Sequence, residues 1–211
     1  MTTESTPKWR RLEPDERRKQ IFGCAAELFG ERPYTDVSTS DIATRAGVAR
    51  GLINHYFGTK RELYLVVVRR ALDVPYGVLA RLPPGPIEDR VTAAVDWFLD
   101  MISQQEKMWL AAIAPEGIGR DPEVERILYD ADRNASDRVL EAMGFSPDDP
   151  RWEEWNAALR AFGGLAKATG REWLVRESLN REQVHGLLSH VLLSLTEFLP
   201  TLSAAPVGGR R

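Results

Sequence analysis

Four polar side chains between residues 50 and 60 have the chemistry needed to bind nucleic acid. Arg50 can bond to a phosphate or to guanine, and Asn54 can pair with adenine through two hydrogen bonds. His55 follows directly, and Lys60 supplies a cation that would meet the phosphate backbone. This set would contact double-stranded DNA if one short helix presented it on one face.

The segment 37–60 predicts two short helices joined by a tight turn. Ser38 suits the N-cap of the first helix, and Gly47 can take the left-handed conformation that ends it. The second helix is expected over residues 49–57, with Ile53 on its buried face. Such a helix-turn-helix places the second helix in the major groove. The same pattern also fits a helical corner of an ordinary all-α protein.

A longer motif surrounds these residues: Thr39-x-x-Ile42-Ala43-x-x-Ala46-Gly47-Val48, then Tyr56-Phe57-x-x-Lys60-x-x-Leu63. This motif resembles the DNA-binding signature of TetR-type (tetracycline-repressor-like) transcriptional regulators. The similarity extends back through apolar and aromatic positions, namely Ile21, Ala25, Leu28, Phe29 and Tyr34. It does not extend reliably into the rest of the chain.

The resemblance implies a homodimer that binds a palindromic operator and is released when a small molecule occupies a C-terminal pocket. The implied DNA-facing residues are Thr39, Arg50, Gly51, Leu52, Asn54, His55, Tyr56 and Lys60. The chain departs from the family pattern at three positions, where Ala49 replaces a hydroxyl cap, Leu52 a frequent Thr and Asn54 a frequent Tyr. Base preference therefore cannot be taken over from relatives.

The charge distribution agrees with DNA binding although the net charge is −3. Residues 8–70 carry 13 basic and 8 acidic side chains, whereas residues 71–211 carry 15 and 22. A basic segment next to an acidic one is typical of nucleic-acid-binding proteins. No apolar run is long enough for a transmembrane helix, and a single cysteine, Cys24, agrees with a cytoplasmic protein without membrane partners.

The expected fold is all-α, with an N-terminal three-helix DNA-binding domain and a C-terminal helical ligand-binding and dimerisation domain. The expected divisions are an arm at 1–13, the helix-turn-helix domain at 14–58, the second domain at 59–200 and a tail at 201–211. Lys8, Arg10 and Arg11 either reach phosphate or the minor groove or belong to a solvated tail.

Apolar periodicity and turn residues predict the helices. They run over 14–31, from 59 to a break at Pro75, and then over 86–104, 107–114, 122–143, 150–177 and 181–199. The loop 115–120 contains Gly-x-Gly, which is either an ordinary turn or an anion site.

The last two predicted helices are long and apolar, and such a pair can dock on a copy of itself as a four-helix bundle. The expected dimer interface is Trp173, Val184, Leu188, Val191 and Leu195. Gly163 and Gly164 would allow a close helix approach. The alternative is that this helix pair only completes the core of the monomer.

Trp and Met are frequent in the C-terminal half, which indicates an apolar pocket between helices. The expected lining is Trp97, Met101, Trp109, Tyr129, Trp155 and Phe162, with an apolar or aromatic ligand. The alternative is an ordinary packed core.

Catalysis is not expected, because the sequence contains no zinc-ligand spacing and no Gly-rich loop after a predicted strand. No cofactor is predicted. The remaining alternatives are a regulator controlled by a protein partner, an activator, and a purely structural bundle.

Overall fold

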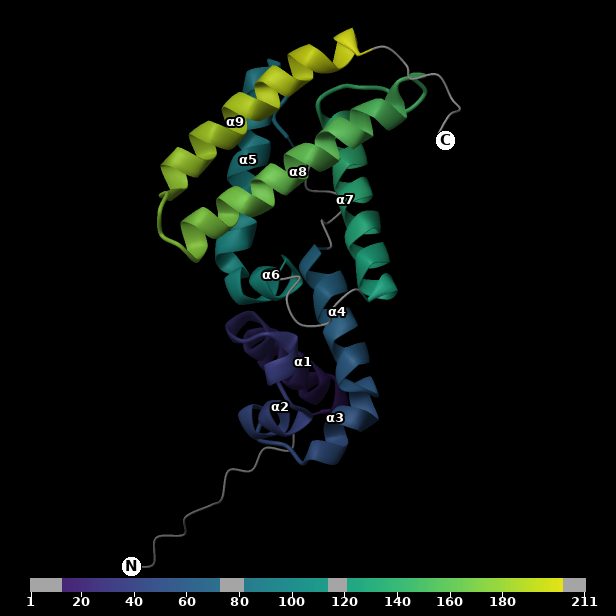
Figure 1. Cartoon of the computed structure of the whole chain (residues 1–211), viewed down its shortest axis with the longest axis vertical. Coiled ribbons are helices and arrows are strands. Elements are labelled where there is room, and N and C mark those ends of the chain that lie inside the picture. The colour runs from purple at the N-terminus through teal and green to yellow at the C-terminus, as the bar shows by residue number, and fades with distance from the viewer. Residues whose placement is uncertain (1–12, 73–81, 114–120, 203–211) are drawn as a thin grey trace, which may run out of the picture.

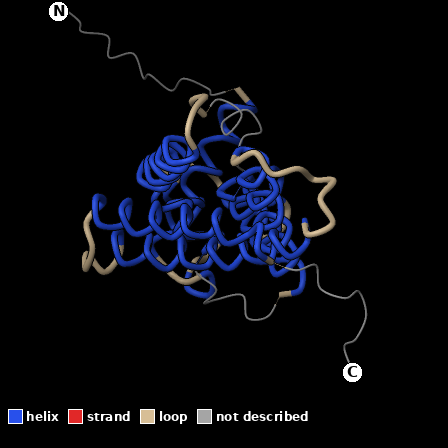
Figure 2. Tube along the Cα trace, turned by 90° about the horizontal axis from the view of Figure 1, so that it is seen from above, coloured by secondary structure: helices blue, strands red, loops and turns tan. Residues whose placement is uncertain are grey.

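The computed structural model describes residues 13–72, 82–113 and 121–202. Within these segments the chain forms helices and no strand (Figure 2), so the all-α prediction is confirmed. The helices are α1 (Pro14–Glu31), α2 (Thr39–Arg45), α3 (Arg50–Phe57), α4 (Lys60–Leu72), α5 (Ile87–Gln104), α6 (Glu106–Ile113), α7 (Pro122–Ala142), α8 (Trp152–Leu174) and α9 (Arg181–Phe198). Two short 3-10 turns, η1 (Tyr34–Asp36) and η3 (Leu199–Thr201), complete the set.

The helices form two groups along the long axis of the molecule (Figure 1). Helices α1, α2 and α3 lie together at one end, and α4 leads from them to the other helices. Helices α8 and α9 run antiparallel and side by side at the far end, over α5 and α7. The short helix α6 lies between the groups and packs on both α1 and α4.

Each group has its own apolar core. The first core combines buried side chains of α1–α4 with Ala111, Ala112 and Ile127 from α6 and α7. The second core combines α5–α9 and includes Leu99, Ile102 and Trp155. The buried residues of α4 belong to the first core, so the boundary between the two cores does not lie at residue 58. The predicted domain boundary at that residue stays a prediction.

Ion pairs join the first and last turns of α4 to the start of α7. Arg61 donates to Asp121 at 2.7 Å and to Glu123 at 2.9 Å, and Arg69 donates to Glu123 at 2.9 Å. The hydrogen bond from Arg61 is the largest influence that lowers the pKa of Asp121, to about 2. The same carboxylate caps α7 through the amides of Glu123 and Val124.

The predicted helix positions agree closely with the observed ones, and the ends of α8 and α9 differ. Helix α8 ends at Leu174, because the amides of Arg176 and Ser178 fold back onto carbonyls of the last turn. Glu177 follows with a φ of 52°, which no helix accommodates. Helix α9 ends at Phe198 and tightens into η3.

Three sequence-based expectations fall outside the described residues. They concern the basic arm with Lys8, Arg10 and Arg11, the break at Pro75, and the Gly-x-Gly loop.

Candidate nucleic-acid interface and ligand cavity

The start of α2 and the turn between α2 and α3 are built by local hydrogen bonds. The Ser38 hydroxyl accepts from the Asp41 amide at 3.0 Å, and the Asp41 carboxylate accepts from the Ser38 amide at 2.9 Å. Gly47 ends α2 with a φ of 61°, and the Val48 amide donates to the Ala43 carbonyl. A side chain at Gly47 would be strained in this conformation. The predicted helix-turn-helix thus forms from its own capping residues.

Helix α3 divides into a buried face and an exposed face. Ile53 and Phe57 are buried against α1, α2 and α4. The predicted DNA-facing residues Arg50, Gly51, Asn54 and His55 are all exposed, whereas Leu52 and Tyr56 are half-buried. A Cβ added at Gly51 would meet no atom within 4 Å, so open space lies over this part of the helix.

Two of the predicted residues contact each other across the turn. The Arg50 Nε donates to the Thr39 hydroxyl at 3.1 Å, which links α3 to α2. The terminal nitrogens of the same guanidinium keep their donors for another partner. Next to it on α3, the rings of His55 and Tyr56 pack edge to face at 5.1 Å.

Lys60 occupies a position that the sequence did not indicate. Its ammonium donates to the carbonyls of Tyr34 and Val37, both at 2.9 Å, and lies 3.9 Å from the centre of the Tyr34 ring. Burial lowers the pKa of Lys60 below its usual value. Two of its three donors are therefore used to hold the loop before α2, and one remains for a phosphate. No local pattern reveals this contact, because the carbonyls lie 26 and 23 residues earlier.

An ion cluster joins α1, α2 and α6 at the edge of this domain. Glu31 accepts from Arg45 at 2.9 Å and from Lys107 at 2.8 Å. These hydrogen bonds, first that from Arg45 and then that from Lys107, lower the pKa of Glu31 from 4.5 to about 2. The cluster is another feature that sequence analysis missed, since its members are 14 and 76 residues apart.

Helix α6 touches both groups of helices through glycines. A Cβ on Gly30 of α1 would lie 2.2 Å from the Lys107 carbonyl oxygen, so the α1 and α6 backbones are in direct contact. A Cβ on Gly170 of α8 would lie 2.5 Å from the ring of Trp109. In contrast, one on Gly163 or Gly164 would meet nothing within 4 Å. Within the single chain, Gly170 and not this glycine pair is the α8 glycine in close contact with another helix, through the Trp109 side chain.

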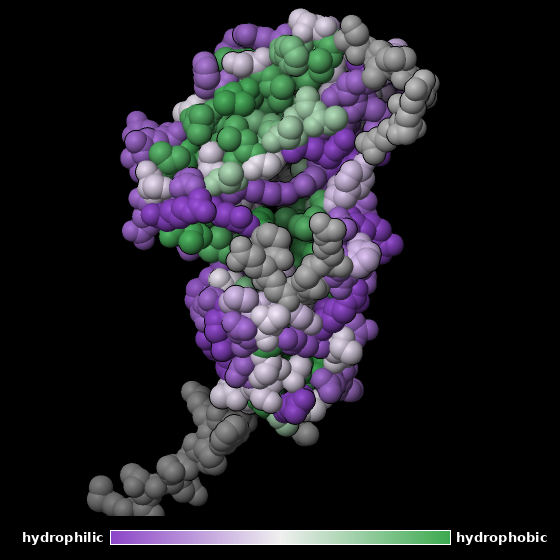
Figure 3. Space-filling view, in the orientation of Figure 1, coloured by the Kyte–Doolittle hydropathy of each residue, from purple (hydrophilic) through white to green (hydrophobic). Residues whose placement is uncertain are grey.

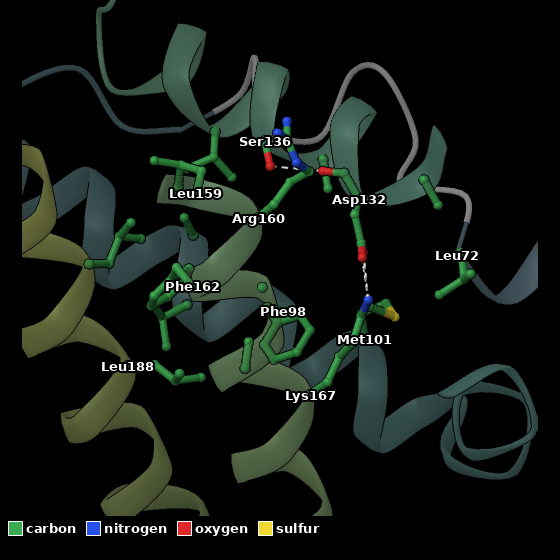
Figure 4. Close-up of a pocket in the computed structure, with 18 of the residues that line it drawn as sticks. Leu72, Phe98, Met101, Asp132, Ser136, Leu159, Arg160, Phe162, Lys167 and Leu188 are labelled. Carbon is green, nitrogen blue, oxygen red and sulfur yellow. Dashed lines mark hydrogen bonds and ion pairs between the residues drawn. The ribbon is translucent and has the colours of Figure 1, made fainter. Parts of the chain in front are cut away.

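A cavity of about 170 Å³ lies beside the second core and is lined by residues from each of the helices α4 to α9. Four of the six predicted residues line it: Trp97, Met101, Trp109 and Phe162. The lining is mainly apolar and continues with Phe98, Leu159 and Leu188 (Figure 4). The predicted apolar pocket is therefore present among the described residues.

Tyr129 and Trp155 do not line this cavity, which corrects the expectation for these two residues. Tyr129 lies on the outer side of α7 and is 50% exposed. Trp155 is buried in a separate packing arrangement, where its Nε1 donates to the Leu199 carbonyl at 2.8 Å and its ring meets Phe145. A buried indole N–H needs a hydrogen-bond acceptor, and for Trp155 that acceptor is the Leu199 carbonyl, which lies away from the cavity.

The cavity also has polar residues that the sequence analysis did not identify. They are Asp132 and Ser136 on α7, and Arg160 and Lys167 on α8. Their spacings of four and seven residues put each pair on one helix face, which was the available signal. Polar residues at such spacings usually form the solvent-exposed face of a helix, so the spacing alone does not distinguish a cavity wall from the protein surface.

The predicted dimer interface stays a prediction, and two of its five residues are buried within the single chain. Val184 and Leu188 are 0% and 1% exposed in the single chain, where they belong to the second core. Trp173, Val191 and Leu195 are half-buried. The more exposed apolar residues of this region are Val175, Phe198 and Leu187, and apolar atoms gather over α8 and α9 in Figure 3.

These features define a helix-turn-helix protein with a second helical region that encloses a cavity. A sequence profile of the tetR family of bacterial regulatory proteins matches residues 21–67. The chain is 30% identical over 196 residues to the transcriptional regulator BetI of Escherichia coli, which covers 88% of this chain and 95% of that protein. It is also 30% identical over 168 residues to the transcriptional activator FasR of Mycolicibacterium smegmatis, with 78% and 75% covered.

Solved structures share the fold. A tetR-family regulator from Streptomyces coelicolor superimposes with a TM-score of 0.71 at 23% identity, covering 90% of this chain and 84% of that one. The fatty acid degradation regulator FadR from Bacillus halodurans gives a TM-score of 0.62 at 16% identity, covering 95% and 100%. The chain belongs to the TetR family and is a DNA-binding transcriptional regulator.

Over the described ranges, no helix has the length and apolar character to cross a bilayer. In the same ranges, no three His, Cys, Asp or Glu side chains are grouped so that they could hold a metal ion.

Proposed function

We propose that this regulator binds a palindromic operator as a homodimer and leaves it when a small molecule occupies the cavity, so that it acts as a repressor. The observation that carries the proposal is the division of α3, which has Ile53 and Phe57 buried and Arg50, Asn54 and His55 exposed. A helix held by one face and open on the other suits the major groove.

The proposed roles of the DNA-facing residues follow from their chemistry. Arg50 and Asn54 contact base edges, and the side chain of Leu52 meets a thymine methyl group. His55, Tyr56 and Thr39 contact the backbone, and Gly51 lets the helix approach closely. Lys60 contributes mainly by holding the loop before α2, and its third donor is available to a phosphate.

Dimerisation through α8 and α9 is supported by the exposed apolar side chains on that face. The proposed interface is Trp173, Leu187, Val191, Leu195 and Phe198. It leaves out Val184 and Leu188, because both are buried within the single chain. An isologous pairing of two such helices makes a four-helix bundle and matches a two-fold symmetric operator. We also propose the division into DNA-binding and ligand-binding domains near the start of α4.

The ligand acts by shifting a population between two spacings of the recognition helices. A molecule that binds the DNA-incompetent form more tightly removes the protein from the operator, and one without that preference has no effect. Activation is the second candidate, since the relative FasR is named as an activator.

The test is a titration of the purified chain with DNA from upstream of its own gene, at two salt concentrations and with competitor DNA. We expect specific binding that weakens steeply with salt, because phosphate contacts release counterions. Asn54→Ala should change base preference at one position of each half-site in a randomised-site selection. Asn134→Ala on α7 is the matched control and should change nothing.

Equal competition by any DNA would contradict operator binding. Sedimentation of a monomer at the concentrations that bind DNA would contradict the homodimer. A Leu187→Glu variant that stays dimeric would move the interface away from α9. Transcription from the upstream promoter, measured with and without the protein, then separates repression from activation.

A further inference from the structure

One buried charged donor at the cavity lacks a hydrogen-bond partner, and it belongs to Arg160. Arg160 extends from α8 toward Ser136 on α7, at one end of the cavity (Figure 4). Its Nη1 is buried and makes no hydrogen bond to any described residue. The guanidinium carbon lies 5.6 Å from the centre of the Tyr129 ring, which covers one side of it. A buried charged donor without an acceptor is unfavourable, so a ligand that supplies one is favoured here.

The two other ionised groups of the cavity neutralise each other. The Lys167 ammonium lies 2.6 and 2.7 Å from the two carboxylate oxygens of Asp132. Asp132 is therefore engaged on both oxygens and is a poor site for a cationic ligand. The Ser136 hydroxyl lies beside Arg160 and donates to the main-chain oxygen of Asp132 at 2.8 Å. The lining as a whole thus carries one uncompensated positive charge.

The rest of the wall is apolar and sets the size of the occupant. Phe98, Met101, Phe162 and Leu188 surround the space. Its volume of about 170 Å³ is close to that of engineered apolar cavities, of roughly 150 Å³, that hold benzene. The cavity reaches the α8 backbone at Gly163, where an added Cβ would meet no atom within 4 Å.

We infer that the cavity binds a small amphipathic monocarboxylate, either a single-ring aromatic acid or a short acyl chain, with its carboxylate on Arg160 and its apolar body between α5, α8 and α9. A carboxylate matches the guanidinium fork in shape, and one negative charge matches the one uncompensated positive charge. A phosphate dianion would need a second cation, and Lys167 is already paired. The inference rests on the proposed function in that it names the effector class of the same cavity.

The test measures binding to the full chain without DNA. Calorimetry is performed with benzoate, phenylacetate, hexanoate and octanoate, with the amide of each acid, and with benzylamine as a cation of similar size. We expect at least one acid to bind about tenfold or more tightly than its amide, because a charge-assisted pair is stronger than a neutral hydrogen bond.

Three variants locate the carboxylate and the apolar body. Arg160→Gln should weaken the acid about tenfold and leave the amide nearly unchanged, whereas Arg160→Lys should retain part of the preference. Gly163→Leu should weaken acids and amides alike by filling the cavity. Arg176→Gln, just beyond the end of α8, is the matched control and should bind as the wild type does.

Thermal unfolding distinguishes a ligand-binding role of Arg160 from a role in stabilising the fold. If Arg160 serves the ligand, Arg160→Gln keeps or raises the melting temperature of the free protein, since it removes an unpaired donor, and loses the shift produced by the acid. If the side chain mainly stabilises the fold, the melting temperature of the free variant falls, and the inference is overturned.

Other outcomes also decide the inference. It is overturned if no acid binds at millimolar concentration, if amides or benzylamine bind as well as the acids, or if Arg160→Gln binds the acids unchanged. A failure of these acids together with specific operator binding rejects the ligand class and leaves the proposed function intact. Binding of acids through Arg160 without any specific DNA binding rejects the proposed function and leaves the ligand class intact.

Discussion

The two glycine contacts of α6 differ in what lies against them. On the side of the DNA-binding helices, Gly30 meets the backbone carbonyl of Lys107. On the side of the cavity, Gly170 meets the ring of Trp109, which also lines the cavity. A backbone contact allows little adjustment, whereas a ring can turn into adjacent space. Helix α6 is therefore tied firmly to α1 and adjustably to α8.

The firm contact is tested most directly by Gly30→Ala. A Cβ would lie 2.2 Å from the Lys107 oxygen and 2.7 Å from its carbonyl carbon, so α6 must move away from α1. We expect a loss of about 1–3 kcal/mol in the free energy of unfolding, as for other overpacked sites. Operator binding should weaken as well. The measurements are urea denaturation and DNA titration.

Gly23→Ala on the same helix is the control for this change, because an added Cβ there meets nothing within 4 Å. Equal unfolding free energies for the Gly30→Ala and Gly23→Ala variants would mean that the α1–α6 contact adapts easily. The proposed contrast between the two sides of α6 would then be lost.

A second change on the firm side is Tyr64→Phe. The Tyr64 hydroxyl donates to the Ala111 carbonyl at 3.1 Å and ties α4 to α6, while its ring packs edge to face on Phe29 at 5.1 Å. Removal of the hydroxyl keeps the ring and should cost about 1 kcal/mol in urea denaturation. Tyr129→Phe, at an exposed position, should cost nothing measurable. If the two variants were equally stable, the hydrogen bond from Tyr64 would not be part of the firm side.

The adjustable side is tested by Gly170→Ala. We expect little net change in stability, since Trp109 can turn toward the cavity and Ala favours a helix over Gly by up to about 1 kcal/mol. Binding of a carboxylate to the cavity should nevertheless weaken, because the ring would occupy part of the space. Calorimetry and urea denaturation measure the two effects, with Gly164→Ala as control. A stability loss as large as that of Gly30→Ala would show that both sides of α6 are equally rigid.

The smallest expected effect concerns the ion cluster on the firm side. The pKa of Glu31 is lowered to about 2, so the native state favours the carboxylate form. Its stabilisation is present above the ordinary value of 4.5 and is lost as the pH falls toward 2. The difference in unfolding free energy between wild type and Glu31→Gln should therefore be small and constant near neutral pH and should disappear in acid.

Glu125→Gln on α7 provides the control for the pH series, and its difference from the wild type should not follow the same profile. A Glu31→Gln difference that persisted to the lowest pH would mean that the carboxylate charge does not hold α1, α2 and α6 together.

The sequence predicted the helix-turn-helix well because that element is determined locally. Ser38, Gly47 and the apolar spacing around Ile53 specify capping, turn and buried face within a short stretch. The role of Lys60 was missed because its partners belong to a loop whose position depends on the packing of Tyr34. Local patterns predict which face of a helix is apolar, and they do not say which long-range partner a polar group will meet.

The cavity lining was predicted only in part for the same reason, and the burial of α9 residues was not resolved by the sequence. Apolar spacing on α9 identified Val184, Leu188, Val191 and Leu195 as one set, but such a set can pack on α5 within the chain and, in the proposed dimer, on a second copy. Periodicity cannot divide one wide apolar surface between them. Likewise, a tryptophan such as Trp155 suits a cavity wall and a sealed core equally, and the position of the Leu199 carbonyl decided between them.

The anchoring of Lys60 has a consequence for the rate at which the protein finds its operator. The two hydrogen bonds to the Tyr34 and Val37 carbonyls keep the loop before α2 in place in the free protein. Association with DNA then requires little loss of conformational entropy from this loop, and encounters in the right orientation can proceed without a slow rearrangement. Lys60→Met would release the loop, so the change should reduce the association rate constant more than it increases the dissociation rate constant.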